Sequence, residues 1–490
     1  MLFDFNEAWP RVSEARYDVC VCGSGPAGIT AARKLASYGK RVLLLEGGEL
    51  TYSDRSQDCY KGKSIGKPFW WIETGRLRYF GGTSNHWAGL CAIFDPVSYE
   101  TYDHHGLPGW PISYEQVVQN QAEAQEILDV PGKYLGRAEQ SGFKSPWFGQ
   151  FTYAKSPPTR FSMKYGDELR RSQQIDTFYN ANVIDIKLVD DLSGVKSIRV
   201  QNYNGQKIDV SASQYVIAFG GLENPRILLN ANSQIPEGIG NQTEMVGRCF
   251  MESLNVPVGR FLITDPDFWR QEGVLLVPTE DMVHQKDIGT GVMDFTPDAT
   301  AQALRHAGRL GVLKDFLRDT GCYWPALRDL ARKITDFTCP GDGIIATMIE
   351  QEPNLKSRVS LMDEVDAFGL RRIQFDWQFT ERDFKTIRTL AIESAKEMAR
   401  LNRARVQLAP EILDPHLEIT RVAGHGHHMG TTRMSADPRH GVVDENCRVH
   451  GIRNLYVIGC STFPKCGGRN PTLTVVLLAL RLGHHLGRKS

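Results

Sequence analysis

The segment Tyr17-Asp18-Val19-Cys20-Val21-Cys22-Gly23-Ser24-Gly25-Pro26-Ala27-Gly28 carries the clearest structural signal in this 490-residue chain. Its first six residues are typical of a short buried strand. From Ile29 to Tyr38, apolar residues recur at helical spacing, and Gly39 can end that helix. A second strand is predicted over Arg41–Leu45. The order strand, glycine turn, helix, strand predicts one unit of an α/β fold.

The three glycines of this turn suit the binding of a dinucleotide. Gly23 permits a tight turn, Gly25 lets the backbone approach a pyrophosphate, and Gly28 lets helix and strand pack closely. Glu46 follows Gly28 by 18 residues and is placed to accept hydrogen bonds from a ribose. A lone glycine pattern often marks an ordinary turn, but here strand and helix flank it. We therefore expect cofactor contacts from Gly23, Ser24, Gly25, Pro26, Ala27, Gly28, Glu46 and Gly47.

A second glycine-rich loop favours a flavin over a nicotinamide cofactor. It runs from Arg78 to Ala88 without helical periodicity, and its paired glycines precede small hydroxyl residues. Such a loop suits close approach to a second part of a large cofactor, although an ordinary surface turn is the alternative. The residues expected to contribute are Arg78, Gly81, Gly82, Thr83, Ser84, Asn85, His86, Trp87 and Ala88.

The rest of the chain mixes strand-like and helical stretches. Helices are expected over Tyr114–Leu128, 301–335 and Asn470–Leu486, and the apolar face of 301–335 suits core packing better than partner binding. Strands are expected over 181–186, 215–219, 348–353, 357–362, 372–379, 441–444 and 455–459. The second of these leads through Gly220 into Asn224-Pro225-Arg226 and a helix. The 135–165 region shows no clear period.

Composition describes an ordinary globular protein. Lys and Arg together number 57, as do Asp and Glu, and this zero net charge argues against nucleic acid or an anionic membrane as the main partner. The N-terminus lacks the pattern of a signal peptide, and the apolar run Leu473–Leu482 is too short to span a bilayer. The ten cysteines include no CxxC pair, and Cys20 and Cys22 are expected as buried thiols. We expect a reduced, cytoplasmic protein.

Four histidines gather near the C-terminus: His425, His427, His428 and His440. They invite comparison with a metal site, but no carboxylate or cysteine stands beside them at ligand spacing. We expect no metal here, and structural roles for His425 and His428. Gln351 is expected as a buried, hydrogen-bonded glutamine rather than a residue facing a substrate.

Taken together, these motifs resemble the glucose–methanol–choline (GMC) oxidoreductases. The motifs are the glycine turn with Glu46, the Gly81-Gly82-Thr83-Ser84 loop, Asn224-Pro225-Arg226, and the His427/Asn470 tail. The resemblance implies an α/β fold: a Rossmann-like FAD-binding domain with an interleaved α+β substrate-binding domain on a mostly antiparallel six-stranded sheet. It assigns residues 1–98, 179–255 and 423–490 to the FAD domain, and 99–178 and 256–422 to the substrate domain.

Within that family, Gly459-Cys460-Ser461-Thr462-Phe463-Pro464 and Asn470-Pro471-Thr472-Leu473-Thr474 are similar to the pyranose oxidase and glycoside 3-oxidase or 3-dehydrogenase branch. The likeness implies His427 as catalytic base and Asn470 as its hydrogen-bonding partner. It also implies FAD contacts from Val183, Gly220, Asp444, Gly459, Cys460, Pro471 and Thr472. Some relatives attach FAD covalently at the position of His86, and others keep that histidine without the bond. Glu252-Ser253 departs from the Asp-His pair of many members.

The expected activity is FAD-dependent oxidation of a secondary alcohol of a sugar or glycoside, at C2 or C3 of a pyranose. The hydride passes to the flavin while a histidine of near-neutral pKa takes the hydroxyl proton. Oxygen, a quinone or a redox partner could accept the electrons, and a homo-oligomer is possible. Alternatives are a flavin-containing lyase, oxidation of a non-sugar alcohol in secondary metabolism, and a non-catalytic FAD-binding module of an electron-transfer complex.

Overall fold

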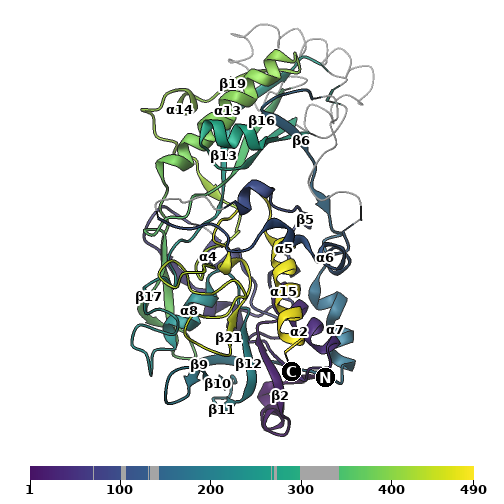
Figure 1. Ribbon diagram of the computed structural model, residues 1–490, viewed down its shortest axis with the longest axis vertical. Coiled ribbons are helices and arrows are strands. Elements are labelled where there is room, and N and C mark those ends of the chain that lie inside the picture. The colour runs from purple at the N-terminus through teal and green to yellow at the C-terminus, as the bar shows by residue number, and fades with distance from the viewer. Residues whose placement is uncertain are drawn as a thin grey trace.

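The computed structural model describes residues 1–69, 71–100, 106–130, 132, 143–265, 268–269, 273–297 and 342–489. The elongated molecule has a parallel sheet at one end and an antiparallel sheet at the other, and the two chain termini lie beside each other at the parallel end (Figure 1). The helix predicted over 301–335 lies outside the described residues. In the described part of the chain, no helix combines the length and apolarity needed to cross a bilayer.

The parallel sheet contains the strand predicted before the glycine turn. Its order is β1 (Leu2–Asp4), β8 (Ile175–Tyr179), β3 (Val42–Leu45), β2 (Tyr17–Cys22), β12 (Ala212–Ile217) and β21 (Leu455–Val457). Every pairing along it is parallel. All four residues of β3 are buried, as expected for a strand covered on both faces. Cys20 and Cys22 are buried free thiols, which confirms that prediction.

Helices α2 (Pro26–Ser37) and α15 (Thr472–Gly487) pack against each other beside this sheet (Figure 1). Small residues allow the contact, because a Cβ on Gly483 would lie 2.7 Å from Lys34 Cβ. Gly28 likewise lets α2 approach the turn, since its added Cβ would lie 1.8 Å from the carbonyl oxygen of Gly23. A third helix, α7 (Phe161–Arg171), also contacts α2, although no helix is predicted there.

The antiparallel sheet confirms the expected antiparallel platform but has seven strands rather than six, because one short strand pairs off its main order. Its order is β19 (Ala404–Leu408), β13 (Ser253–Ile263), β16 (Asp342–Glu350), β15 (Gly291–Pro297), β14 (Val274–Pro278) and β6 (Phe148–Phe151). The two-residue strand β20 (Ala423–Gly424) adds to β13 at the start of the histidine-rich tail. Helix α13 (Glu381–Arg400) packs against this sheet and begins with a capping box from Thr380 and Asp383.

Smaller elements complete the fold. Three further sheets are formed by β9 (Asn182–Leu188), β10 (Val195–Gln201) and β11 (Lys207–Val210), by β17 (Arg358–Val365), β18 (Arg371–Asp376) and β4 (Gly62–Ser64), and by β5 (Leu90–Cys91) and β7 (Ala154–Lys155). Within the described ranges, the other α-helices are α1 (Phe5–Ala8), α3 (Asp54–Gln57), α4 (Trp71–Thr74), α5 (Tyr114–Val118), α6 (Gln121–Leu128), α8 (Glu223–Asn230), α9 (Glu280–Lys286) and α14 (Pro410–Leu413).

Two local predictions need correction. The helix predicted over Tyr114–Leu128 is two helices, because α5 ends at Val118 and α6 begins at Gln121. Residues 441–444 form only isolated bridges at Val443 rather than a strand, because Val443 pairs with single residues on two other segments. The division of the chain into five alternating domain segments stays a prediction.

Candidate active site

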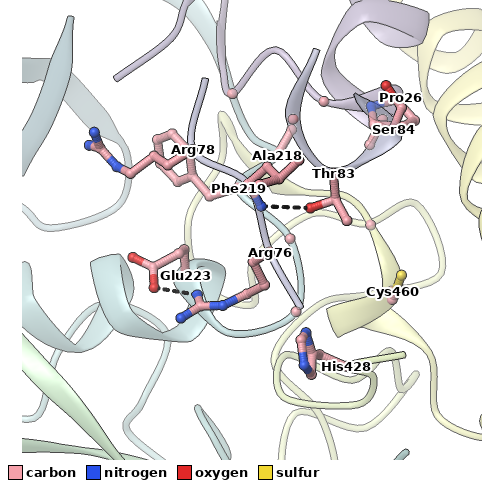
Figure 2. Close-up of a pocket in the computed structure, with 18 of the residues that line it drawn as sticks. Pro26, Arg76, Arg78, Thr83, Ser84, Ala218, Phe219, Glu223, His428 and Cys460 are labelled. Carbon is pink, nitrogen blue, oxygen red and sulfur yellow. Dashed lines mark hydrogen bonds and ion pairs between the residues drawn. The ribbon is translucent and has the colours of Figure 1, made fainter. Parts of the chain in front are cut away.

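A cavity of about 590 Å³ opens beside the end of β2, where the order in which the chain adds strands to the parallel sheet reverses. The chain continues from β2 to β3 on one side, and β12 lies on the other side of β2. In open parallel sheets, ligands bind outside the carboxyl ends of the strands at such a point. Segments far apart in the sequence line the cavity: 23–27, 74–78, 82–84, 86–90, 218–221, 425–428 and 470–472. Figure 2 shows Pro26, Thr83, Ala218 and His428 around it.

The N-terminal glycines form a cradle that a dinucleotide fits. A Cβ added to Gly25 would meet nothing within 4 Å, and the same holds for Gly220. Helix α2 begins directly after Gly25, and no side chain caps its first N–H groups. A helix N-terminus of this kind favours a phosphate through its free N–H donors. The cradle and a cavity of this volume therefore suit FAD.

Glu46 is tied to the glycine turn. Its Oε2 accepts hydrogen bonds from the backbone N of Ser24 at 3.1 Å and from Ser24 Oγ at 2.6 Å. Its Oε1 accepts from the backbone N of Gly48 at 2.8 Å. Glu46 thus holds the turn in shape and still lines the cavity. Its predicted contact with a ribose stays a prediction.

Most of the residues predicted from the sequence line this one cavity. They are Gly23, Ser24, Gly25, Pro26, Ala27, Glu46, Gly47, Arg78, Gly82, Thr83, Ser84, His86, Trp87, Ala88, Val183, Gly220, His427, Gly459, Cys460, Asn470, Pro471 and Thr472. Gly28, Gly81, Asn85 and Asp444 are not among its lining residues. Asn85 donates instead to the carbonyl oxygen of Phe80 and accepts from Ser162 Oγ at 2.6 Å. The Asp444 side chain accepts from the backbone N of Asn446 and of Arg448, both at 2.9 Å, within its own loop.

His427 is held at two points. Its backbone N donates to Glu252 Oε1 at 2.7 Å, and its ring Nδ1 lies 3.0 Å from Ser253 Oγ. Its ring stacks on that of His425, with centroids 5.6 Å apart. Burial, and then the nearby His425, lower the pKa of His427 to about 3. The imidazole is therefore neutral at pH 7, which is the form that can accept a proton, but its pKa lies below the near-neutral value expected from the sequence because burial disfavours the charged ring.

Asn470 lies before α15 rather than within it, because the helix begins at Thr472 and Pro471 is its cap residue. The preceding residue, Arg469, is fully buried and anchors this segment. Its guanidinium donates to the carbonyl oxygens of Gly291 at 3.1 Å and Gly468 at 2.7 Å, and pairs with Asp95 at 2.5 Å. Asn470 is thus fixed between the antiparallel sheet and α15.

The other histidines have different surroundings. His428 is buried, contacts the ring of Phe69, and has no hydrogen-bond partner for Nε2 among the described residues. Burial, and then the charge of Arg160, lower the pKa of His86, which lines the cavity. Within the described ranges, no three His, Cys, Asp or Glu side chains gather closely enough to hold a metal ion.

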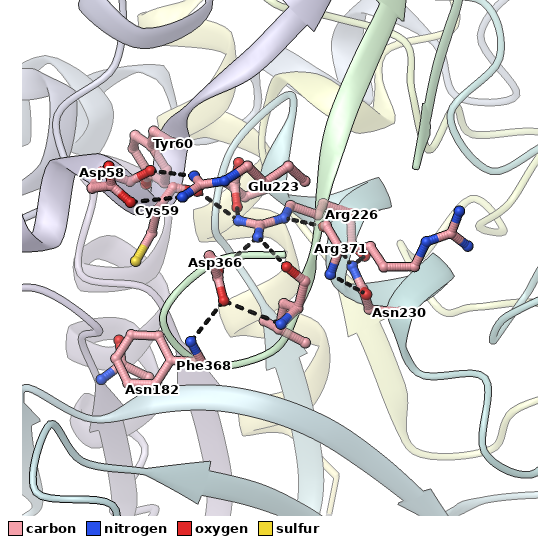
Figure 3. Close-up of polar contacts among 12 residues, drawn as sticks. Asp58, Cys59, Tyr60, Asn182, Glu223, Arg226, Asn230, Asp366, Phe368 and Arg371 are labelled. Atoms are coloured by element: carbon pink, nitrogen blue, oxygen red, sulfur yellow. Dashed lines mark hydrogen bonds and ion pairs between the residues drawn. The ribbon is translucent and has the colours of Figure 1, made fainter. Parts of the chain in front are cut away.

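A network of buried charges borders the cavity, and most of it was not predicted from the sequence. Arg76 pairs with Glu223 at 2.6 Å (Figure 2). Arg226 pairs with Glu223 at 3.0 Å and with Asp366 at 2.7 Å, and so joins α8 to the turn between β17 and β18 (Figure 3). Although burial opposes it, the charges of Arg226 and Arg76 hold the pKa of Glu223 below its usual value. Of the residues around this network, only the motif Asn224-Pro225-Arg226 was singled out from the sequence, and none of the ion pairs was predicted.

Replacing Arg226 with methionine should destabilise the protein strongly. Asp366, whose side chain is 2% exposed, would lose the cation that pairs with it. Leaving one partner of a buried ion pair typically costs ~3–5 kcal/mol. Urea unfolding of the FAD-loaded protein measures this loss. Arg199→Met is the matched control, because the Arg199–Asp209 pair is about 40% exposed and should contribute only ~0–1 kcal/mol. Equal effects of the two substitutions would contradict the structural role of Arg226.

Comparisons with known proteins bear on this site. A family model described as GMC oxidoreductase matches residues 353–479, and one described as FAD binding domain matches 16–58. The 6'''-hydroxyparomomycin C oxidase of Streptomyces lividus is 25% identical, with 96% of this chain and 91% of that protein aligned. The C-glycoside 3-oxidase of Microbacterium trichothecenolyticum is 24% identical over 65% of this chain and 55% of its own length. Among solved structures, pyridoxine 4-oxidase from Mesorbium loti has a TM-score of 0.58 at 16% identity, covering 96% of this chain and 99% of that one.

Fold, cavity and comparisons together define a flavoprotein, an FAD-dependent oxidoreductase of alcohols. More particularly, its residues 353–479 match the GMC oxidoreductase family model.

Proposed function

We propose that this enzyme oxidises a secondary hydroxyl of a sugar or glycoside to a ketone, at C2 or C3 of a pyranose. The observation that carries the proposal is that His427 and Asn470, far apart in the sequence, both line the cavity that fits FAD. The names of two relatives, 6'''-hydroxyparomomycin C oxidase and C-glycoside 3-oxidase, support a carbohydrate substrate. When bound, FAD supplies the acceptor for the carbinol hydride.

In this proposal His427 takes the hydroxyl proton. Its Nδ1 is engaged by Ser253 Oγ at 3.0 Å, so we assign the proton-accepting role to Nε2, with the ring proton donated from Nδ1 to the serine. Asn470 donates its amide N–H to the substrate oxygen and stabilises the negative charge that develops there. An amide cannot itself take up the proton, so the two side chains do not compete for it.

Anaerobic mixing of the enzyme with a panel of sugars and glycosides tests the proposal. Bleaching of the flavin by a carbohydrate, with the corresponding ketosugar as product, is the expected result. A panel that leaves the flavin oxidised and unchanged would overturn it. Turnover with the flavin oxidised throughout would point to a lyase, and bleaching by non-sugar alcohols alone would point to a different substrate class.

The electron acceptor is tested in the same experiment. Air is admitted to the reduced enzyme, and the rate at which the flavin colour returns is measured. Fast return shows an oxidase, and slow return with fast reoxidation by a quinone or dichlorophenolindophenol shows a dehydrogenase. A homo-oligomer remains a proposal, and the sedimentation velocity of the FAD-loaded enzyme measures the oligomeric state.

A further inference from the structure

Glu252 is a buried carboxyl that no step of the proposed reaction uses. It stands immediately before β13, and its side chain is completely buried. Its Oε1 accepts hydrogen bonds from the backbone N of Ser253 at 2.9 Å and from the backbone N of His427 at 2.7 Å. One oxygen atom of Glu252 therefore joins Ser253, the first residue of β13 in the antiparallel sheet, to the backbone of His427, which lies 175 residues after Glu252.

The antiparallel sheet holds Glu252 in turn. Its backbone N donates to Gln351 Oε1 at 3.0 Å, and the same oxygen accepts from Trp377 Nε1 at 3.0 Å. Gln351 Nε2 donates to the carbonyl oxygen of Gln378 at 2.9 Å, so Gln351 is the buried, hydrogen-bonded glutamine expected from the sequence. The tail packs closely on the other side, since a Cβ on Gly424 would lie 2.7 Å from Glu252 Cγ.

Glu252 has no cation within ion-pair distance among the described residues. The titratable residues beside it are His425 and His427 from the tail, whose backbone N–H groups reach its carboxyl, and Cys460 and Cys466 from the segment after β21. Burial raises the pKa of Glu252 to about 8, against the opposing effect of the backbone N–H groups of His427, Ser253, His425 and Gly426. At pH 7 the carboxyl is therefore mainly uncharged.

We propose that Glu252 is a positioning residue that clamps the backbone of His427 while Ser253 holds its ring, so that the imidazole faces the cavity. This clamp rests on the proposed role of His427 as base. Because the acid is neutral, it orients His427 without adding a negative charge beside the flavin site. An amide side chain would serve the same purpose, since its carbonyl oxygen can accept both N–H groups.

Three variants test the clamp. Glu252→Gln keeps the accepting oxygen and should leave kcat within about threefold of wild type, which corresponds to less than 1 kcal/mol. Glu252→Ala removes that oxygen and should lower kcat by roughly 10–100-fold, because small displacements of a catalytic group are costly. KM and FAD content should change little. Asp383→Asn, at a buried carboxyl that caps α13, is the matched control and should leave kcat unchanged. The substrate used is the panel carbohydrate that reduces the flavin fastest.

Hydrogen–deuterium exchange measures whether Glu252 protects the backbone N–H of His427, and it needs no substrate. The peptide that spans 423–430 should exchange faster in Glu252→Ala and as in wild type in Glu252→Gln, because only the alanine variant frees the N–H of His427. Unchanged exchange in the alanine variant, or equal loss of kcat in both variants, would overturn the proposal. If His427→Ala kept full activity, the proposed base would fail instead, whatever the exchange result. If His427→Ala lost activity and Glu252→Ala did not, only the clamp would fail.

The uncharged state of Glu252 has its own pH signature. Its pKa is raised in the folded protein from 4.5 to about 8, so on raising the pH the unfolded chain ionises first. Wild type should therefore lose stability relative to Glu252→Gln between about pH 4.5 and pH 8, and the difference in Tm should stay constant above pH 8. A Tm difference that does not vary across this range would show that the carboxyl is ionised when folded, and would contradict the neutral clamp.

Discussion

Replacing His427 with alanine should slow reduction of the bound flavin by substrate ~10²–10⁴-fold, the usual contribution of a general base. The cavity would keep its glycine cradle, so FAD content should be unchanged. The variant removes the imidazole whose Nδ1 contacts Ser253 and whose ring lines the cavity. Stopped-flow measurement of flavin bleaching under anaerobic conditions gives the rate.

The matched control for His427→Ala is His440→Gln. His440 lies in the same tail but not among the residues that line the cavity, and its carbonyl oxygen, which Arg433 contacts at 2.8 Å, is unaffected by the change. The control should reduce its flavin at the wild-type rate. A full rate in His427→Ala would remove the proposed base, and His425→Ala would then test the neighbouring histidine as the proton acceptor.

The second large effect is expected at the glycine turn, where one substitution should weaken FAD binding and another should prevent folding. Gly25 has φ −73° and ψ −176°, which any residue adopts, and a Cβ there meets nothing within 4 Å. Gly25→Val should therefore fold but block the approach of the FAD phosphates. Losing hydrogen bonds to a charged group costs on the order of 3 kcal/mol, which is about 100-fold in affinity.

Gly28→Ala should instead prevent folding of the FAD domain. Its Cβ would lie 1.8 Å from the carbonyl oxygen of Gly23, a distance that forces α2 away from β2. Circular dichroism and FAD fluorescence separate the two cases: folded protein that releases FAD for Gly25→Val, and aggregated or unfolded protein for Gly28→Ala. A soluble Gly28→Ala protein that holds FAD would contradict the role of this close packing between helix and turn.

Part of the fold could be predicted because its signals are local. The strand over Tyr17–Cys22 was predicted with its observed limits, since a parallel strand buried on both faces appears as a continuous apolar run. Helix α7 was not predicted, although Phe161, Tyr165 and Leu169 recur at helical spacing, because prolines and glycines surround it. Helix α13 carries the same kind of pattern in Ile387, Leu390 and Ala391 and could have been found from it.

The sequence alone determined which chemical groups this protein has available. These are a glycine turn for a dinucleotide, a second glycine loop, a histidine that can accept the proton of an alcohol, and an asparagine that can hydrogen-bond to its oxygen. Only the tertiary structure decided which groups act on one another. Glu252 reaches His427 across 175 residues, and Arg226 reaches Asp366 across 140. Contacts at such separations leave no periodic pattern in the chain, because they depend on how two sheets and a tail pack. They exist only once the hydrophobic core has brought those segments together.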